Sequence, residues 1–575
     1  MSAQILKAIE LQENTEQLRA QLRAELAECV KANSTGKNHV LEFMLRHEIW
    51  HIAELDYPLR EQFKLELQEK EYVRYTIRAY LRAYDRIKQH SVQQQIRVFI
   101  KGKQTAPSYE NEIFFLPYHP DPQIAERYIN ATNKGDLVWD FQRQAPLQLK
   151  HQVFDILNYA VKADASAETI RLNLLGLHEL YDFCTEEGIA DIEQLELEQI
   201  QRFSERESTR INKECRLRSL NFCRKALFMM ADEINWNAHV WYMERIHLQP
   251  ERVDLASPVT ALSFLEVTHQ KNRELLKQYM RYGLGVTNLS INALRTEMNY
   301  VRGFLADLEQ SESENVCTVT AEQMDAYFQK ERMRPVQAET FNKRIMSILH
   351  FFSFLRARQY IDRIPFDEEY YLKKTMACHH DRSVEEATVD EILGKLHAFP
   401  EDLRLMFLHL WGIGLRISEV CILKGDAYYI QGQDAWIQVY QTKMRRYKRI
   451  PIPAALYELM KVYLRKYDIK ADEYVFKNHK GGAYRSGTFR YRMLKYCEAN
   501  NIQDGEYIFK SHDFRHTVAT QFYDAGVPLQ SIRDYLGHDY EEMTQQYVDY
   551  MPKRIEKASE EYFSQHSLAS CIRKR

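Results

Sequence analysis

The stretch SHDFRHTVATQFYDAGVPLQSIRDYLGHDYEEMTQQY, residues 511–547, decides how the rest of the chain is interpreted. His512 and Arg515 are three residues apart, so on a helix they project from one face. Gly526 and Pro528 follow, and this pair is typical of a helix end and a new helix start. The stretch therefore predicts two helices, the first of which carries a histidine and an arginine side by side.

His538 follows the second of these helices at a Leu-Gly turn, and Tyr547 comes nine residues later. Arginine can bind phosphate oxygens, histidine can move a proton, and a tyrosine oxygen can attack phosphorus. The residue types therefore suit phosphodiester chemistry without a metal ion. Tyr540 and Tyr550 lie nearby, so residue type alone does not single out Tyr547.

The composition is that of an ordinary globular protein. A chain of 575 residues should hold about three or four domains. Its 19 glycines and 15 prolines are few for this length, which favours helices over loop-rich sheets. The formal net charge of −3 excludes a uniformly basic protein, so any nucleic-acid surface must be local.

Neither a membrane segment nor a cofactor motif is apparent. No apolar run approaches the roughly 18 residues of a membrane helix, and the polar N-terminus is unlike a signal peptide. The nine cysteines form no CxxC pair and read as reduced cytosolic thiols. Cys378, His379 and His380 are the only metal-like cluster, but they lack a second ligand pair and read as a linker. We expect a cytoplasmic protein with no metal, no other cofactor and no membrane partner.

Helical periodicity predicts a mainly α multidomain fold, with helical bundles followed by an α+β domain that contains a small β-hairpin. The expected domains are an N-terminal helical domain of unknown role (1–145), a helical bundle (150–250), a second bundle (262–375) and the α+β domain with a C-terminal helix (386–575). The two bundles share a weak pattern in which Phe183 corresponds to Phe304 and Asn212 to Asn342. Duplication of one bundle and chance similarity of two bundles both remain open.

Three upstream features add charge to the 511–547 stretch. Arg416 lies in GIGLRISEV (412–420), where a glycine-broken helix end leads into the next helix. A strand pair at 435–452 has a strongly basic turn, and residues 477–495 hold six Lys or Arg and no acidic residue. Such patches in a slightly acidic chain predict a DNA cradle that makes salt-dependent phosphate contacts. The expected DNA-binding residues are Arg445, Arg446, Lys448, Arg485, Arg490 and Arg492.

Together these motifs resemble the catalytic domain of tyrosine recombinases, the phage integrase family. That family has an arginine in GLRxSE, a lysine in a β-hairpin, then HxxRH, GH and a tyrosine. The corresponding residues here are Arg416 in GLRISE, Lys443 in TKMRRYKRIP, His512 and Arg515 in HDFRH, His538 in LGHD, and Tyr547. The hairpin lysine rests on register and could instead fall on Arg445 or Arg446. Residues 262–375 are more loosely similar to the family's SAM-like core-binding domain.

The resemblance implies a site-specific DNA recombinase that cuts and rejoins strands through a covalent 3′-phosphotyrosine. Arg416 and Arg515 would bind the non-bridging oxygens, with His538 as a third donor. Tyr547 would be the nucleophile, His512 would assist proton removal, and Lys443 would protonate the leaving 5′ oxygen. The alternatives are a type IB topoisomerase, a telomere resolvase, or a DNA-binding accessory protein without catalysis.

The same resemblance implies partners. The chain would act on double-stranded DNA at specific recombination sites, as a homotetramer and with possible helper recombinases, on the bacterial nucleoid. Its extra length is similar to that of transposon-borne members, which suggests integration or excision of a mobile element. Residues 553–575 carry apolar side chains at helical spacing and would dock into a neighbouring protomer, or else pack on their own domain.

Overall fold

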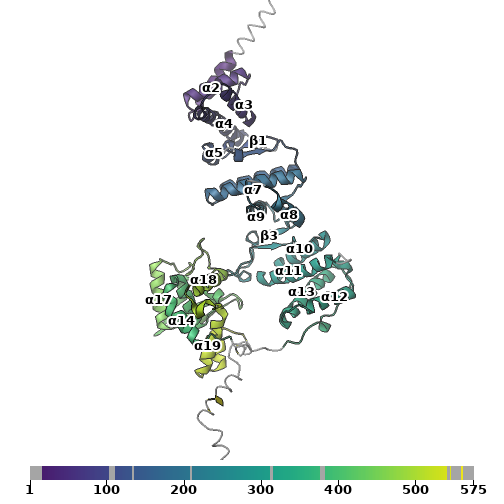
Figure 1. Cartoon of the computed structure of the whole chain (residues 1–575), viewed down its shortest axis with the longest axis vertical. Helices are drawn as coiled ribbons and strands as arrows, with labels where there is room; N and C mark the ends of the chain where they lie inside the picture. The colour runs from purple at the N-terminus through teal and green to yellow at the C-terminus, as the bar shows by residue number, and fades with distance from the viewer. Residues whose placement is uncertain are drawn as a thin grey trace, which may run out of the picture. The chain divides into compact units, whose positions relative to one another are not determined.

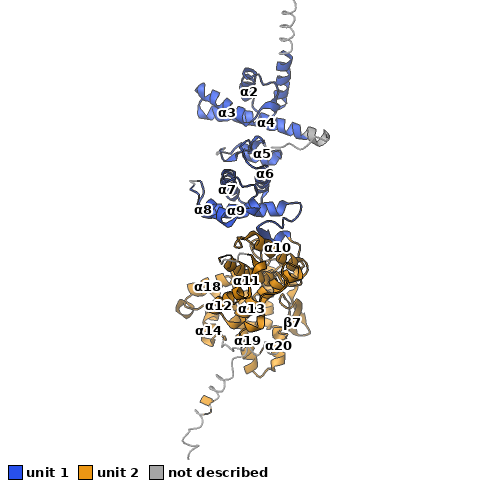
Figure 2. Cartoon of the chain, turned by 90° about the vertical axis from the view of Figure 1, so that its right-hand side faces the viewer, with its two compact units in different colours: residues 1–245 blue, residues 246–575 orange. Residues whose placement is uncertain are grey.

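The computed structural model describes residues 16–102, 111–131, 135–207, 210–310, 315–375, 382–539, 544, 559–560 and 562. The chain divides into two compact units, residues 1–245 and 246–575 (Figure 2). It is mainly helical with short antiparallel sheets, so the predicted fold class is confirmed. Within the described residues, no helix is both long enough and apolar enough to cross a membrane.

The first unit contains two helical bundles (Figure 1). The first consists of a helix over residues 16–28, α2 (Ser34–Arg46), the 3₁₀ turn η1 (Ile52–Glu54), α3 (Tyr57–Glu69) and α4 (Arg74–Gly102). Then come β1 (Ile113–Phe115), α5 (Pro122–Ile129) and β2 (Val138–Asp140), and β1 pairs antiparallel with β2. The second consists of α6 (Leu147–Lys162), α7 (Ala167–Glu186), η4 (Ile192–Gln194), α8 (Leu197–Glu205) and α9 (Lys213–Met230), followed by β3 (Val240–Tyr242).

The second unit opens with a third bundle. After β4 (Ala261–Ser263) it consists of α10 (Gln270–Gly285), α11 (Ile291–Glu309), η7 (Val316–Thr318), α12 (Ala321–Arg332) and α13 (Ala338–Ala357). All three bundles thus have the order helix, helix, 3₁₀ turn, helix, helix. In each, an aromatic ring on the second helix packs on one from the third, with centroids 5.0 to 5.4 Å apart. The pairs are Phe43 with Phe63, Phe183 with Phe203, and Phe304 with Tyr327.

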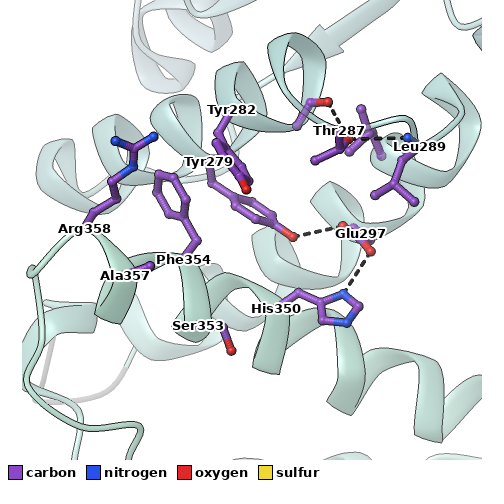
Figure 3. Close-up of a pocket in the computed structure, with 12 residues that line it drawn as sticks. Tyr279, Tyr282, Thr287, Leu289, Glu297, His350, Ser353, Phe354, Ala357 and Arg358 are labelled. Atoms are coloured by element: carbon purple, nitrogen blue, oxygen red, sulfur yellow. Dashed lines mark hydrogen bonds and ion pairs between the residues drawn. The ribbon is translucent and has the colours of Figure 1, made fainter.

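The bundles differ seven residues before that aromatic ring. Gly36 and Gly176 hold this position in the first two bundles, where an added Cβ would lie within 2.4 Å of a side chain on the fourth helix. The third bundle has Glu297 instead, which accepts a hydrogen bond from Tyr279 and pairs with His350 (Figure 3). These three side chains help to line a cavity of about 550 Å³. Glycine therefore leaves room for the fourth helix in the first two bundles, whereas a glutamate holds this position in the third.

The rest of the second unit is the α+β part. Its elements are α14 (Glu386–Lys395), α15 (Glu401–Ile413), α16 (Ile417–Cys421), β5 (Tyr428–Gln431), β6 (Asp434–Gln441), β7 (Arg446–Pro451), α17 (Ala454–Lys466), α18 (Ser486–Ala499), α19 (Ser511–Asp524) and α20 (Leu529–Leu536). The expected strand pair is β6 and β7, and β5 adds a third antiparallel strand to β6 that the sequence did not predict. One apolar core joins the sheet to the surrounding helices.

Candidate active site

Two glycines with left-handed backbone conformation lie just before residues of the site. α15 ends at Gly414, with φ of 64°, and α20 ends at Gly537, with φ of 71°. Such a backbone favours glycine because a Cβ would be strained there. At Gly537 a Cβ would also lie 2.4 Å from the amide nitrogen of Gln441. The first turn leads to Arg416, which caps α16, and the second leads directly to His538.

Arg515, on α19, is only 1% exposed and is held at three points. Its guanidinium donates to the carbonyl oxygens of Gly414 at 2.9 Å and Leu536 at 2.6 Å, and it lies 2.9 Å from Nε2 of His538. Because a guanidinium can only donate, we assign Nε2 as the acceptor. Nδ1 then carries the proton and donates to Thr544 Oγ1 at 2.9 Å. Arg515 is therefore fixed by the protein itself.

Glu419 lies among three cations. Its carboxylate accepts from Arg416 Nη1 at 3.0 Å and Gln441 Nε2 at 3.2 Å, and it lies 3.6 Å from Lys448 Nζ. Burial alone would raise the pKa of this carboxyl, but Lys448, Arg515 and Arg416 lower it below its usual value. A buried anion thus balances the cations of the site before any phosphate arrives.

The β6–β7 hairpin presents its two lysines in different ways. Lys443 lies exposed in the turn, whereas Lys448 on β7 is buried and donates to the carbonyl oxygen of Leu536 at 3.3 Å. Burial lowers the pKa of Lys448 to about 8, although Glu419 opposes this. Lys448 was expected to contact DNA from the surface, but its side chain points inward to the Glu419 cluster.

Both histidines of the site are neutral at pH 7. His512, in the first turn of α19, has an exposed outer edge. The protein packed behind its ring lowers its pKa to about 4, and the cationic Arg515 and Arg416 add to this effect. Burial, followed by the same arginines, lowers the pKa of His538 to about 2. His512 can therefore accept a proton at neutral pH.

The other residues predicted to bind DNA differ in whether their side chains are already bonded to other parts of the protein. Arg490 is exposed and pairs with no other residue in the described part of the chain. Arg445 donates to the carbonyl oxygen of Asn288, Arg446 pairs with Asp539 at 3.0 Å, and Arg485 donates to the carbonyl oxygen of Leu255. Arg492 pairs with Asp402 and Tyr484.

Several predicted features fall outside the described residues. They include the expected nucleophile Tyr547 and the nearby Tyr540 and Tyr550. They also include the cluster of Cys378 with its two histidines and most of the 553–575 segment. Among the residues that the structure does describe, no group of three His, Cys, Asp or Glu could hold a metal ion.

Sequence reasoning gave no role to three residues of this site, Glu419, Gln441 and Thr544. Glu419 could have been suspected, because it follows Arg416 by three residues in GLRISE and so can reach back to it at a helix start. Gln441 is a polar residue on the buried side of the alternating strand β6. No sequence pattern indicated a role for Thr544.

Residues 382–554 match the model of the phage integrase family. The match identifies a phage integrase family domain in this part of the chain. Transposase B of transposon Tn554 from Staphylococcus aureus is 28% identical over 327 residues, which are 55% of this chain and 51% of that protein. Tyrosine recombinase XerA of Pyrococcus furiosus is 25% identical over 295 residues, 50% of this chain and 93% of that protein. The chain spans about half the length of the transposases it matches.

Solved structures of recombinases also align with the chain. XerH recombinase bound to palindromic difH substrate aligns with a TM-score of 0.40 at 16% identity, over 52% of this chain and 90% of that one. A lambda integrase dimer bound to a COC′ core site aligns with a TM-score of 0.38 at 16% identity, over 48% of this chain and 76% of that one.

Proposed function

We propose that the chain is a site-specific DNA recombinase that cuts and rejoins strands through a covalent 3′-phosphotyrosine on Tyr547. The observation that carries this proposal is the guanidinium of Arg515, buried and held beside His538, with Arg416 and Lys448 grouped around Glu419. Membership of residues 382–554 in the phage integrase family supports it.

The chemistry follows from the charges. The pentacoordinate transition state of a phosphodiester gains negative charge on its non-bridging oxygens, and fixed arginines stabilise that charge without reorganising. Arg416 and Arg515 supply these donors. His538 now accepts from Arg515 through Nε2. It becomes a third donor only when a phosphate oxygen replaces this contact and the proton moves from Nδ1 to Nε2, with Nδ1 then accepting from the Thr544 hydroxyl.

The two proton transfers are assigned to His512 and Lys443, which are both exposed. Neutral His512 takes the phenolic proton as the Tyr547 oxygen bonds to phosphorus, and the phosphorus–5′ oxygen bond breaks. Lys443, in the exposed turn, gives a proton to that leaving oxygen. Rejoining reverses both transfers, with the phosphotyrosine conserving the bond energy.

The biological role we propose is integration or excision of a mobile element in a bacterial cell, on the nucleoid. The Tn554 transposase supports this role as a similar protein. Residues 262–375 would act as the core-binding domain and 386–575 as the catalytic domain, closing around duplex DNA. Four copies would pair two sites, joined through the 553–575 segment, and helper recombinases could take part.

The test uses nicked suicide DNA substrates and denaturing gels. Wild-type protein should form a covalent protein–DNA adduct, Tyr547→Phe should not, and the control Tyr550→Phe should form it normally. An undiminished adduct from Tyr547→Phe would overturn the assignment of the nucleophile. Recombinant joints, relaxed circles or hairpin ends as products would distinguish a recombinase from a topoisomerase or a telomere resolvase.

A further inference from the structure

Helix α4 belongs to the first unit (Figure 2). It carries a row of exposed arginines, far along the chain from the candidate active site. Arg74, Arg78 and Arg82 are four residues apart, and all three are exposed. Residues with this spacing lie on one face of a helix, and each step advances about 6 Å along the axis. The α4 arginine row therefore forms a line of charge about 12 Å long.

The row is unusual because it is not neutralised. No ion pair or hydrogen bond joins these three guanidinium groups to any other described residue, whereas most arginines of this unit are paired. Examples are Arg60 with Asp85, Arg86 with Glu126 and Arg202 with Glu187. Arg86 is the next residue of the same spacing, so the row ends where an acidic partner begins. Because the chain as a whole has a net charge of −3, an unpaired line of positive charge is a local feature and not part of a generally basic surface.

The surface beside the row can seat an anion. Arg78 and Arg82 line a hollow of about 100 Å³ together with Asn130 and the buried Arg60, whose charge is taken up by Asp85. An amide and two free guanidinium groups are donors that suit phosphate oxygens. Tyr75, which is 82% exposed, lies on the same helix face as Arg78 and Arg82. Its ring can pack against sugar or base edges next to a bound phosphate.

We infer that the α4 arginine row is a second DNA-binding surface, which contacts the phosphates of one strand of duplex DNA outside the catalytic domain. This inference rests on the proposed function, since it supposes that DNA is the polyanion the chain meets. A straight row of point charges fits a regularly charged strand and gives no base readout, so the contact is independent of sequence. Its effect is to hold DNA that flanks the recombination site.

The test compares two triple variants of the full chain on a fluorescent duplex of arbitrary sequence. Arg74→Gln, Arg78→Gln and Arg82→Gln together remove the row. Arg171→Gln, Arg202→Gln and Arg206→Gln together are the matched control, since they remove the same charge from arginines that already pair with glutamate. Affinity is measured by fluorescence anisotropy from 50 to 200 mM salt. Thermal melting of both variants checks that the exposed substitutions leave the fold intact.

Three phosphate contacts should contribute roughly 2.7 to the slope of log affinity against log salt. Wild-type affinity should therefore fall about 40-fold more than that of the row variant over this range, and the control should behave like wild type. A row variant with the wild-type slope, or a control that loses as much, would overturn the inference. So would a row variant that loses binding to anionic lipid vesicles but keeps its DNA slope.

The same proteins are assayed for the Tyr547 adduct on suicide substrates, which separates the two proposals. A normal adduct with an unchanged slope refutes the row and leaves the proposed function standing. A reduced slope without any adduct from wild-type protein supports the row and refutes the recombinase.

Discussion

Two groups of arginines in this chain carry the same charge but are built in opposite ways. Arg515 is buried and bonded to two carbonyl oxygens and a histidine, and Arg416 is paired with a buried glutamate. The α4 arginine row is exposed and has no partner among the described residues. The first group is held in one geometry, as the proposed binding of a single phosphate requires, while the second is free to follow a phosphate backbone.

The difference lies in what fixes each charge. Taking an arginine out of water costs several kcal/mol unless other groups compensate, and Glu419 with the two carbonyl oxygens provides that compensation. A fixed donor then needs no reorganisation in the transition state. An exposed arginine has no such cost, but its contact with phosphate is screened by salt. We therefore expect geometry to matter in the buried group and only charge to matter in the row.

The largest expected effect is that of Arg515→Lys. A lysine keeps the charge but cannot bond both carbonyl oxygens and still face a phosphate with a planar fork. Adduct formation in single-turnover assays should fall by roughly 10³, about the loss of an essential transition-state donor. Arg465→Lys, at an exposed position on α17, is the matched control and should cleave normally. A decrease of less than tenfold would mean that the bonding of Arg515 does not matter for cleavage.

The next effect concerns the buried anion. Glu419→Gln leaves Arg416 and Lys448 without their counter-charge, so the free energy of unfolding should fall by about 3 kcal/mol in urea titrations. Because the pKa of Glu419 is lowered in the folded chain, its contribution is complete above the ordinary carboxyl pKa and is lost as pH falls below it. Glu168→Gln removes the surface partner of Arg171 and should leave the urea midpoint unchanged. Equal midpoints for both variants would contradict the proposed balance of charge.

The contrast between these groups was only partly predictable from the sequence. Spacing along single helices was enough to expect His512 beside Arg515, and the glycines before Arg416 and His538 indicated helix ends. Glu419 depends on more, because its partners come from β6 and β7 as well as its own helix. Local patterns do not determine which distant segments meet. That is why the motifs indicated the candidate residues but not the carboxylate of Glu419 that lies among them.

The hairpin shows the same limit at the level of one strand. Alternation places Lys448 and Ile450 on one side of β7, and this side is the buried one. The sequence alone suggested a basic surface turn, because the segments that cover Lys448 come from α16 and α20. The helical character of the bundles was easier to predict from their apolar periodicity. The close glycine crossings of the first two bundles needed the structure, since they depend on the partner helix.

A smaller effect concerns pH. His512 has a lowered pKa of about 4, so it stays neutral and able to accept a proton in mildly acidic solution. The rate of adduct formation should therefore change little from pH 7.5 to 5.5, where a histidine of ordinary pKa would lose about tenfold of its neutral form. His512→Gln should be slow throughout this range. A wild-type rate that falls with a midpoint near 6.5 would show that burial and the neighbouring arginines do not hold His512 neutral.

The smallest expected change is none, and it tests whether only charge matters in the α4 arginine row. Arg74→Lys, Arg78→Lys and Arg82→Lys together keep three point charges but replace every planar fork. The slope of log affinity against log salt should stay within about half a unit of the wild-type value, because counterion release depends on charge and not on the shape of the group. Thermal melting again serves as the check on folding. If the lysine row loses as much slope as the glutamine row, guanidinium geometry matters on the surface as well. The row would then resemble the buried group, with its arginines bonding individual phosphates in a fixed arrangement and not following the backbone as a line of charge.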